Sequence, residues 1–165
     1  MADHPQPSGP AEARLSAVDD LIARPFPERE IRPGEEGGWG GPGYHLAVLR
    51  ETRDFWDDRS EEVVEAAERE VEADFAALAE RLASRWGHPE TVDLWPSPDV
   101  DDPDLRHEAP EPVLSLRTVA GSMQVWRLPD SERWLALAIG QADPEFPLQL
   151  LAGVGLASAL TPRAR

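Results

Sequence analysis

The spacing of apolar residues between positions 58 and 86 constrains the fold of this 165-residue chain more than any other feature. Apolar residues recur there at intervals of three and four: Val64, Ala67, Val71, Phe75, Leu78, Leu82 and Trp86. At 100° per residue they fall in one sector of a helix, which is typical of a stripe that faces a core. Asp58 and Ser60 are suitable N-caps, and Gly87 followed by Pro89 is a stop signal. We therefore expect one long amphipathic helix of about 28 residues, about 42 Å in length.

The segments on either side of this helix have the composition and alternation of β-strands. Turn residues at Gly121 and at 129–132 separate three of them, which predicts an antiparallel meander. The expected strands are Tyr44–Arg50, Thr91–Trp95, Val113–Ala120, Ser122–Leu128, Arg133–Gln141 and the start of the apolar run Leu148–Leu160. Whether that run continues as strand or helix stays open, because its glycines weaken a helix and its Ala and Leu residues weaken a strand. The expected fold class is α+β, an antiparallel sheet packed against one long helix.

The N-terminal part of the chain differs in composition from the rest. Residues 1–43 are expected to be a largely disordered segment with a short helix at 11–24. Residues 25–43 hold four Pro and six Gly, which favours a mobile linker. A single α+β domain is then expected over residues 44–160.

The charge of the chain is strongly negative and unevenly distributed. There are 32 acidic and 16 basic residues, a net charge of -16, and this argues against direct binding of nucleic acid. Residues 51–111 alone hold 20 acidic residues and 6 Arg, a net charge of -14. The chain has no Cys, which excludes disulfides and thiol catalysis. No segment has the composition of a membrane span or a secretory signal, so we expect a cytoplasmic protein that does not contact a membrane.

The most specific feature is a second stripe on the long helix, beside the apolar one. Glu61, Glu65, Glu68 and Glu72 follow helical spacing, and the pairs four residues apart should each cost about 0.2–0.5 kcal/mol of helix stability by repulsion. We call these four residues the glutamate row. Its simpler interpretation is a solvated helix face. Its functional interpretation is a docking surface for a basic protein partner.

A second acidic candidate lies in the Pro-rich segment 96–112. Asp99, Asp101, Asp102 and Asp104 resemble an oxygen-rich calcium loop, but the EF-hand pattern fails at Pro103, Asp104 and Pro110. The segment is interpreted as a solvated acidic loop that adds to the same partner surface.

Other motifs identify no catalytic, cofactor or metal residue. Residues 38–43 match the GxGxxG string, but they precede a strand and not a helix, which disfavours a dinucleotide site. His45, His88 and His107 lack metal-ligand spacing, and no Ser has a GxSxG setting.

The chain contains six Trp residues, which are often enriched in binding hot spots. Trp86 continues the helix stripe, and Trp95, Trp126 and Trp134 are expected to cover both faces of the sheet. Trp39 in the Gly-rich segment is either disordered or an anchor for a partner.

The leading hypothesis is a non-enzymatic acidic module, such as an inhibitor, an immunity protein or a chaperone or adaptor, that engages a basic protein. One alternative is a small enzyme or ligand-binding protein with a pocket between helix and sheet. Another is a structural subunit that associates with itself through the apolar C-terminal segment.

Overall fold

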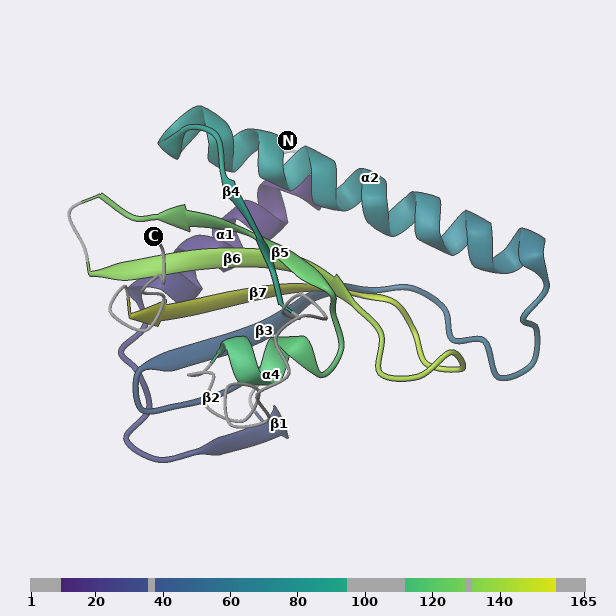
Figure 1. The fold of residues 1–165 in the computed structure, drawn as a ribbon, viewed down its shortest axis with the longest axis horizontal. Helices are drawn as coiled ribbons and strands as arrows, with labels where there is room; N and C mark the ends of the chain where they lie inside the picture. Colours follow the sequence, from purple (N-terminus) through teal and green to yellow (C-terminus); the bar gives the residue numbers. More distant parts are fainter. Residues whose placement is uncertain (1–9, 36–37, 95–111, 130–131, 157–165) are drawn as a thin grey trace, which may run out of the picture.

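A computed structural model describes residues 10–35, 38–94, 112–129 and 132–156, which form one sheet with helices on both faces (Figure 1). The helices are α1 (Pro10–Ala23), α2 (Glu61–Trp86) and α4 (Val113–Arg117). The strands are β1 (Ile31–Glu35), β2 (Gly38–Gly41), β3 (Tyr44–Glu51), β4 (Glu90–Asp93), β5 (Ser122–Arg127), β6 (Arg133–Gly140) and β7 (Gln149–Leu156).

The sheet consists of two antiparallel meanders joined at its centre. Its strand order is β1-β2-β3-β7-β6-β5-β4. Strands β1 to β3 are sequential neighbours, as are β4 to β7, and the meanders meet where β3 pairs antiparallel with β7, with Leu46 opposite Gly153. The expected α+β class, with an antiparallel meander packed against one long helix, is confirmed.

Helix α2 begins and ends close to the predicted positions. The Ser60 hydroxyl accepts a hydrogen bond from the Val63 N–H at 3.4 Å, which satisfies one of the donors left open at a helix start. At the other end Gly87 has φ +93°, a backbone conformation that favours glycine, and its N–H donates to the Ala83 carbonyl at 2.7 Å. The helix is therefore capped at both ends by residues that the sequence identifies.

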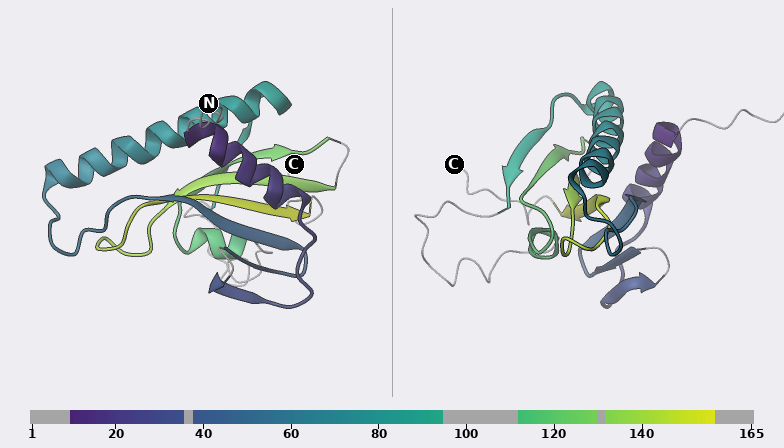
Figure 2. Two further views of the ribbon diagram at one scale, coloured as in Figure 1. Left: turned by 180° about the vertical axis from the view of Figure 1, so that it is seen from behind. Right: turned by 90° about the vertical axis from the view of Figure 1, so that its right-hand side faces the viewer.

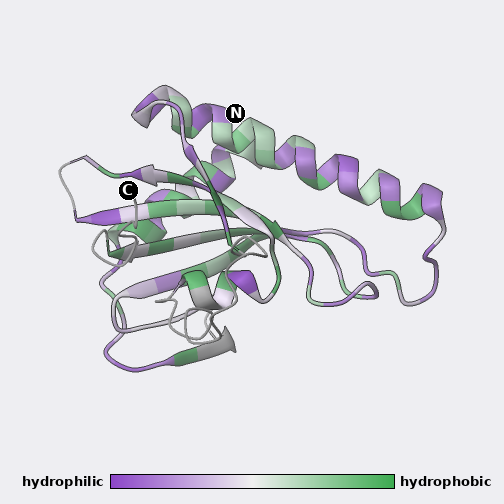
Figure 3. Ribbon diagram, in the orientation of Figure 1, coloured by the Kyte–Doolittle hydropathy of each residue, from purple (hydrophilic) through white to green (hydrophobic). Residues whose placement is uncertain are grey.

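Helices α1 and α2 lie side by side on one face of the sheet (Figure 2). The core between them and the sheet combines Val18 and Leu21 of α1 with Leu78 and Leu82 of α2. The sheet contributes Trp126, Leu128, Leu135, Leu137, Ala152 and Val154, and Trp86 is half-buried against them. Hydrophobic residues follow the central strands, while hydrophilic ones are frequent along the N-terminal half of α2 (Figure 3).

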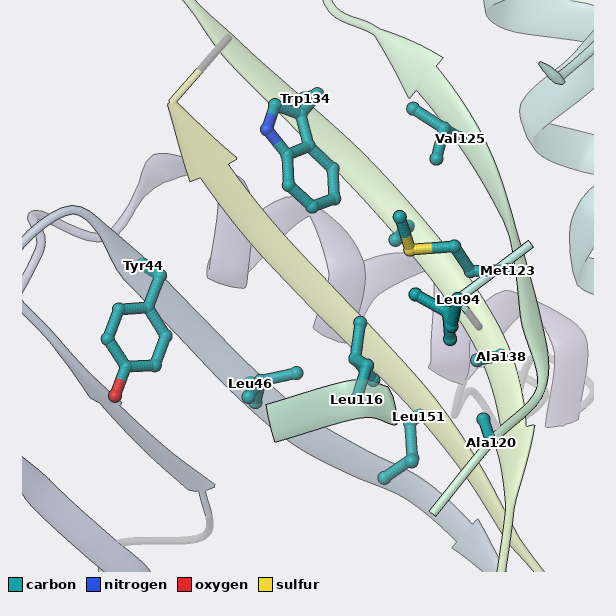
Figure 4. Close-up of a cluster of buried hydrophobic side chains, with 11 residues drawn as sticks. Tyr44, Leu46, Leu94, Leu116, Ala120, Met123, Val125, Trp134, Ala138 and Leu151 are labelled. Atoms are coloured by element: carbon teal, nitrogen blue, oxygen red, sulfur yellow. The ribbon is translucent and has the colours of Figure 1, made fainter. Parts of the chain in front are cut away.

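The opposite face of the sheet has a separate core, covered by α4 (Figure 4). Trp134 is fully buried there, and its indole Nε1 donates to the Leu156 carbonyl at 2.8 Å. Since Trp126 and Trp134 belong to different cores, the expectation that strand Trp residues cover both faces is confirmed for these two. Trp95 lies outside the described residues.

The strand predicted over Val113–Ala120 is wrong, because its first part forms α4. Backbone bonds from Leu116 N–H to Pro112 O and from Ala120 N–H to Leu116 O, both 2.9 Å, replace a strand ladder. Leu116 and Ala120 are buried on the Trp134 core, with Val113 packed against it. Their spacing of three and four residues is also helical, so packing on the sheet decided between two periodicities that the short sequence allowed.

The prediction of a mobile linker over residues 25–43 is also wrong, since β1 and β2 lie within it. Helix α1, Pro10–Ala23, lies at the position of the short helix expected at 11–24. In the β2–β3 hairpin, Gly43 has φ +90°, and a Cβ on Gly40 would lie 2.5 Å from the Tyr44 carbonyl oxygen. These glycines therefore meet the steric demands of a hairpin, a reason for glycine enrichment different from flexibility.

Strand β7 resolves the open question about the apolar run that begins at Leu148. Residues Gln149–Leu156 are a central strand between β3 and β6, while residues 157–160 lie outside the described part of the chain. Leu150, Leu151, Ala152 and Val154 are buried, so their side chains pack in the interior of the fold. Among the described helices, none combines the length and apolar character needed to cross a membrane.

Candidate functional site

Two sets of acidic side chains on α2 have different surroundings, and the first set is paired with Arg. Asp74 contacts Arg50 of β3 at 2.6 Å and Arg14 of α1 at 3.2 Å. Glu70 shares Arg50 with it at 3.2 Å. These carboxylates therefore lie where α1, α2 and β3 meet, and they are neutralised within the fold.

Helices α1 and α2 also form ion pairs nearer the C-terminus of α2. Arg85 of α2 binds Asp19 of α1 through two bonds, of 2.6 Å and 3.3 Å, and this carboxylate raises the pKa of the guanidinium. Arg81 pairs with Glu12. All four side chains are more than a third exposed, so each pair contributes modestly to stability.

The glutamate row is the second set. The structure confirms the local geometry that the sequence predicts, because Glu61, Glu65, Glu68 and Glu72 all lie within α2 and all are exposed. Across the described residues none of the four takes part in an ion pair or a side-chain hydrogen bond. The helix therefore carries a line of about 16 Å of unneutralised carboxylates, from a rise of about 1.5 Å per residue.

The N-terminal end of α2 lies beside two loops at one end of the sheet (Figure 1). These are the β3–α2 connection, residues 52–60, and the β6–β7 connection, residues 141–148. The Thr52 N–H donates to the Leu148 carbonyl at 2.9 Å, and the Leu148 N–H donates to the Thr52 hydroxyl at 3.0 Å. The Phe55 N–H donates to the Glu145 carbonyl at 2.9 Å. The two loops are thus joined to each other by backbone bonds.

Phe55 fixes these loops to the core. Its side chain is fully buried in a cluster with Ala67 and Val71 of α2 and with Leu148 and Leu150. The next residue along the chain, Trp56, is exposed instead.

Trp56 is 61 % exposed, and it contacts Phe146 of the neighbouring loop, which is 39 % exposed. Their ring centroids are 5.6 Å apart and the rings are inclined at 48°. We call Trp56 and Phe146 the aromatic pair. It brings two large apolar side chains from distant parts of the sequence to one exposed position.

Polar contacts lie beside both members of the aromatic pair. Asp54 accepts a long hydrogen bond of 3.5 Å from the Trp56 N–H, and Arg59 contacts Glu145 at 3.2 Å across the two loops. Asp58 accepts from the Ser60 N–H at 2.9 Å, and this bond lowers the pKa of the Asp58 carboxyl. The carboxylate at the start of α2 is therefore charged at neutral pH.

The other predicted site residues do not join this end of the molecule. Trp39 is half-buried in β2 and packs against the core on the face opposite α2, so its neighbours in the sheet, and not disorder, explain its environment. The four aspartates Asp99, Asp101, Asp102 and Asp104 lie outside the described residues.

Sequence reasoning missed Trp56 and Phe146. Trp56 follows directly on a core Phe but lies outside the helical apolar spacing, and Phe146 lies next to Pro147 in a loop. Large apolar residues outside any periodic segment were the available signal.

His45 has a structural environment. Its side chain is buried, Nε2 lies 3.1 Å from the Arg24 carbonyl oxygen, and its ring lies 5.1 Å from that of Phe26. Burial lowers the pKa of this imidazole, and the charges of Arg24 and Arg133 add to the effect. Arg133 also stacks on Phe26 at 3.9 Å, so His45 belongs to a cluster that fixes the chain after α1 to the sheet.

A groove of about 310 Å³ lies between α2 and strands β4 to β6. Phe75 and Met123 supply apolar surface, and Thr91, Ser122 and Gln124 supply hydroxyl and amide groups. The lining contains no ionisable side chain among the described residues, and no group of three or more His, Asp or Glu in that part of the chain could hold a metal ion. The groove can take a small, weakly polar molecule.

Comparisons of the chain with protein-family models, with curated proteins and with solved structures each find no match.

Proposed function

We propose that this protein is a non-enzymatic binding module that engages a basic protein partner through the N-terminal half of α2. Inhibitors, immunity proteins, chaperones and adaptors are the classes that work in this way. The observation that carries the proposal is the contrast between the two sets of acids on one helix. Glu70 and Asp74 are paired with Arg, whereas the glutamate row is exposed and unpaired among the described residues.

The glutamate row is energetically unfavourable for the isolated protein. Like charges four residues apart destabilise a helix by about 0.2–0.5 kcal/mol for each pair. The helix dipole stabilises acidic side chains only within the first turn. It therefore offsets the repulsion at Glu61 but not the repulsion at Glu68 or Glu72. A partner with a basic surface would relieve this repulsion, and the negative field would accelerate its approach.

The test compares three proteins as ligands for the same partner, captured from the native host at 0.1 M salt and then purified. They are the wild type, the triple variant Glu65→Gln, Glu68→Gln and Glu72→Gln, and a control triple variant Glu80→Gln, Glu90→Gln and Asp93→Asn. The control removes equal charge at exposed positions outside the row. We expect the row variant to bind about tenfold more weakly, which is roughly 1.4 kcal/mol, and 0.5 M salt to weaken the wild type.

Unchanged affinity in the row variant, or an equal loss in the control, would contradict the proposal. The first result would show that the row is a solvated face. The second would show that only the total charge matters.

The groove between α2 and strands β4 to β6 favours a second candidate, a small-ligand-binding protein. A ligand of this groove should raise the midpoint of thermal unfolding. Ser122→Phe, which fills the groove, should abolish that shift, whereas the glutamate-row variant should retain it.

A further inference from the structure

The aromatic pair contains two of the exposed large hydrophobic side chains of the described residues. Three large hydrophobic side chains are exposed there, Trp56, Phe146 and Leu156, and the first two contact each other. Single exposed apolar residues are ordinary on protein surfaces. A Trp in contact with a second exposed aromatic ring has instead the composition of a binding hot spot.

The two loops present the aromatic pair in an ordered form. The backbone bonds between Thr52 and Leu148 and between Phe55 and Glu145 join the loops, and buried Phe55 fixes them to the core. Arg59 and Glu145 link the same loops through their side chains. A partner would therefore lose little of its binding energy to ordering this surface.

The charges around the aromatic pair indicate which kind of side chain would bind there. Residues 53–62 hold five acidic side chains and two Arg, a net charge of -3, and the β6–β7 loop adds Asp143 and Glu145. One of the two Arg residues, Arg59, is already paired with Glu145. An acidic partner would be repelled here, whereas a cationic side chain is attracted both by the carboxylates and by the face of a Trp ring.

We propose that the aromatic pair is the anchor of the partner interface and receives an Arg or Lys side chain of the basic partner. This inference rests on the proposed function and names the site where contact is centred. The glutamate row begins five residues after Trp56, so the partner's other basic groups would follow α2 for about 16 Å. The partner surface that fits is a basic segment with one cation held over aromatic rings and several more along a line.

The probe for the experiment is a nona-arginine peptide, titrated into the full chain at 0.1 M salt by calorimetry. The variants are Trp56→Ala, Trp56→Phe and Phe146→Ala, each checked for retained fold by circular dichroism. Leu156→Ala is the matched control, because it removes an exposed apolar side chain at the opposite end of β7. The row variant with three Gln substitutions is measured beside them.

We expect Trp56→Ala to weaken peptide binding about two- to fivefold, the range for an exposed cation–π contact. Phe146→Ala should show a smaller loss, Trp56→Phe should recover most of the affinity, and Leu156→Ala should match the wild type. In NMR spectra, the indole N–H signal of Trp56, assigned from its absence in Trp56→Phe, should shift during the titration.

The possible failures are distinguishable. If the row variant weakens binding while Trp56→Ala and Phe146→Ala do not, the anchor is overturned and the proposed function stands. If nona-arginine does not bind the wild type, both are overturned. Tighter binding of a neutral leucine–serine peptide, or a dimer in sedimentation that Trp56→Ala abolishes, would replace the basic occupant by an apolar segment or by a second copy of this chain.

Discussion

The two halves of α2 differ both in charge and in their relations to the rest of the molecule, since residues 61–73 hold six Glu and one Arg, whereas residues 74–86 hold two acids and two Arg. In the C-terminal half, Arg81 and Arg85 pair with acids of α1, and Leu78 and Leu82 are fully buried. In the N-terminal half, the glutamate row is exposed and lies beside the loops that carry the aromatic pair. In the C-terminal half, ion pairs link α2 to α1, whereas in the N-terminal half Glu70 pairs with Arg50 but the glutamate row has no ion-pair partner among the described residues.

The largest expected effect tests how tightly the loops at the N-terminal end of α2 are packed on the core. Phe55→Ala should lower the free energy of unfolding by about 3–5 kcal/mol, because it removes a fully buried aromatic side chain. The adjacent change Trp56→Ala should stay within about 0.5 kcal/mol, since that side chain is largely exposed. Urea unfolding of both variants measures the difference. Equal losses would show that Trp56 is a core residue and not a surface anchor.

A smaller effect is expected from the ion pairs of the C-terminal half. A double-mutant cycle with Asp19→Asn and Arg85→Gln should give a coupling of about 0.2–1 kcal/mol, as both side chains are more than a third exposed. The coupling should diminish in 0.5 M salt because exposed charges are screened. A coupling of zero at low salt would mean that apolar packing alone aligns α1 with α2.

In the N-terminal half of α2, removing a charge from the glutamate row should stabilise the protein instead of destabilising it. Glu68→Gln should raise the free energy of unfolding by about 0.2–0.5 kcal/mol, because it removes repulsion between Glu68 and Glu72. Glu70→Gln is the control, and it should lower stability, since Glu70 is paired with Arg50. Destabilisation by Glu68→Gln would indicate that the row has a stabilising partner within the chain.

Protonation of His45 should change how the free energy of unfolding depends on pH. Burial keeps the pKa of His45 below the ordinary 6.5, so the unfolded chain binds this proton at higher pH than the folded protein does. The unfolded state therefore gains protons first, and the free energy of unfolding should decrease as pH falls through 6.5 towards the lowered folded value. His45→Gln should flatten this slope between pH 7.5 and 5.5, measured by urea unfolding.

His88→Gln, which removes an imidazole at an exposed position, is the control for this substitution. An unchanged slope in His45→Gln would mean that other groups cause the pH dependence of stability. It would also mean that the cluster of His45, Phe26 and Arg133 is insensitive to the His45 proton.

The sequence predicted the features that depend on local geometry. Helix α2, its caps and the alignment of Glu61 with Glu72 follow from the helical repeat and neighbouring residues. Strands β5, β6 and β7 follow from apolar composition between turn residues. These features need no knowledge of which distant segments touch.

The features that sequence reasoning missed depend on pairing between distant strands. Trp56 meets Phe146 because β3 and β7 are neighbours and their connecting loops are then joined. Residues 113–117 became helical because that short segment packs across a sheet face already formed by other strands. The glycines at 40 and 43 were interpreted as part of a linker, because only the position of β3 places them in a hairpin.

The central position of β7 has a consequence for synthesis of the protein. A ribosome completes β3, α2, β5 and β6 before it produces the strand that joins the two meanders. Until then β3 and β6 each expose an unpaired edge, which is a known route to aggregation of nascent chains. The acidic stretch 51–111 is translated between those edges, and we expect its net charge of -14 to keep the unfinished chains apart. The same carboxylates would then have two roles, the first during synthesis of the chain and the second in binding a basic partner.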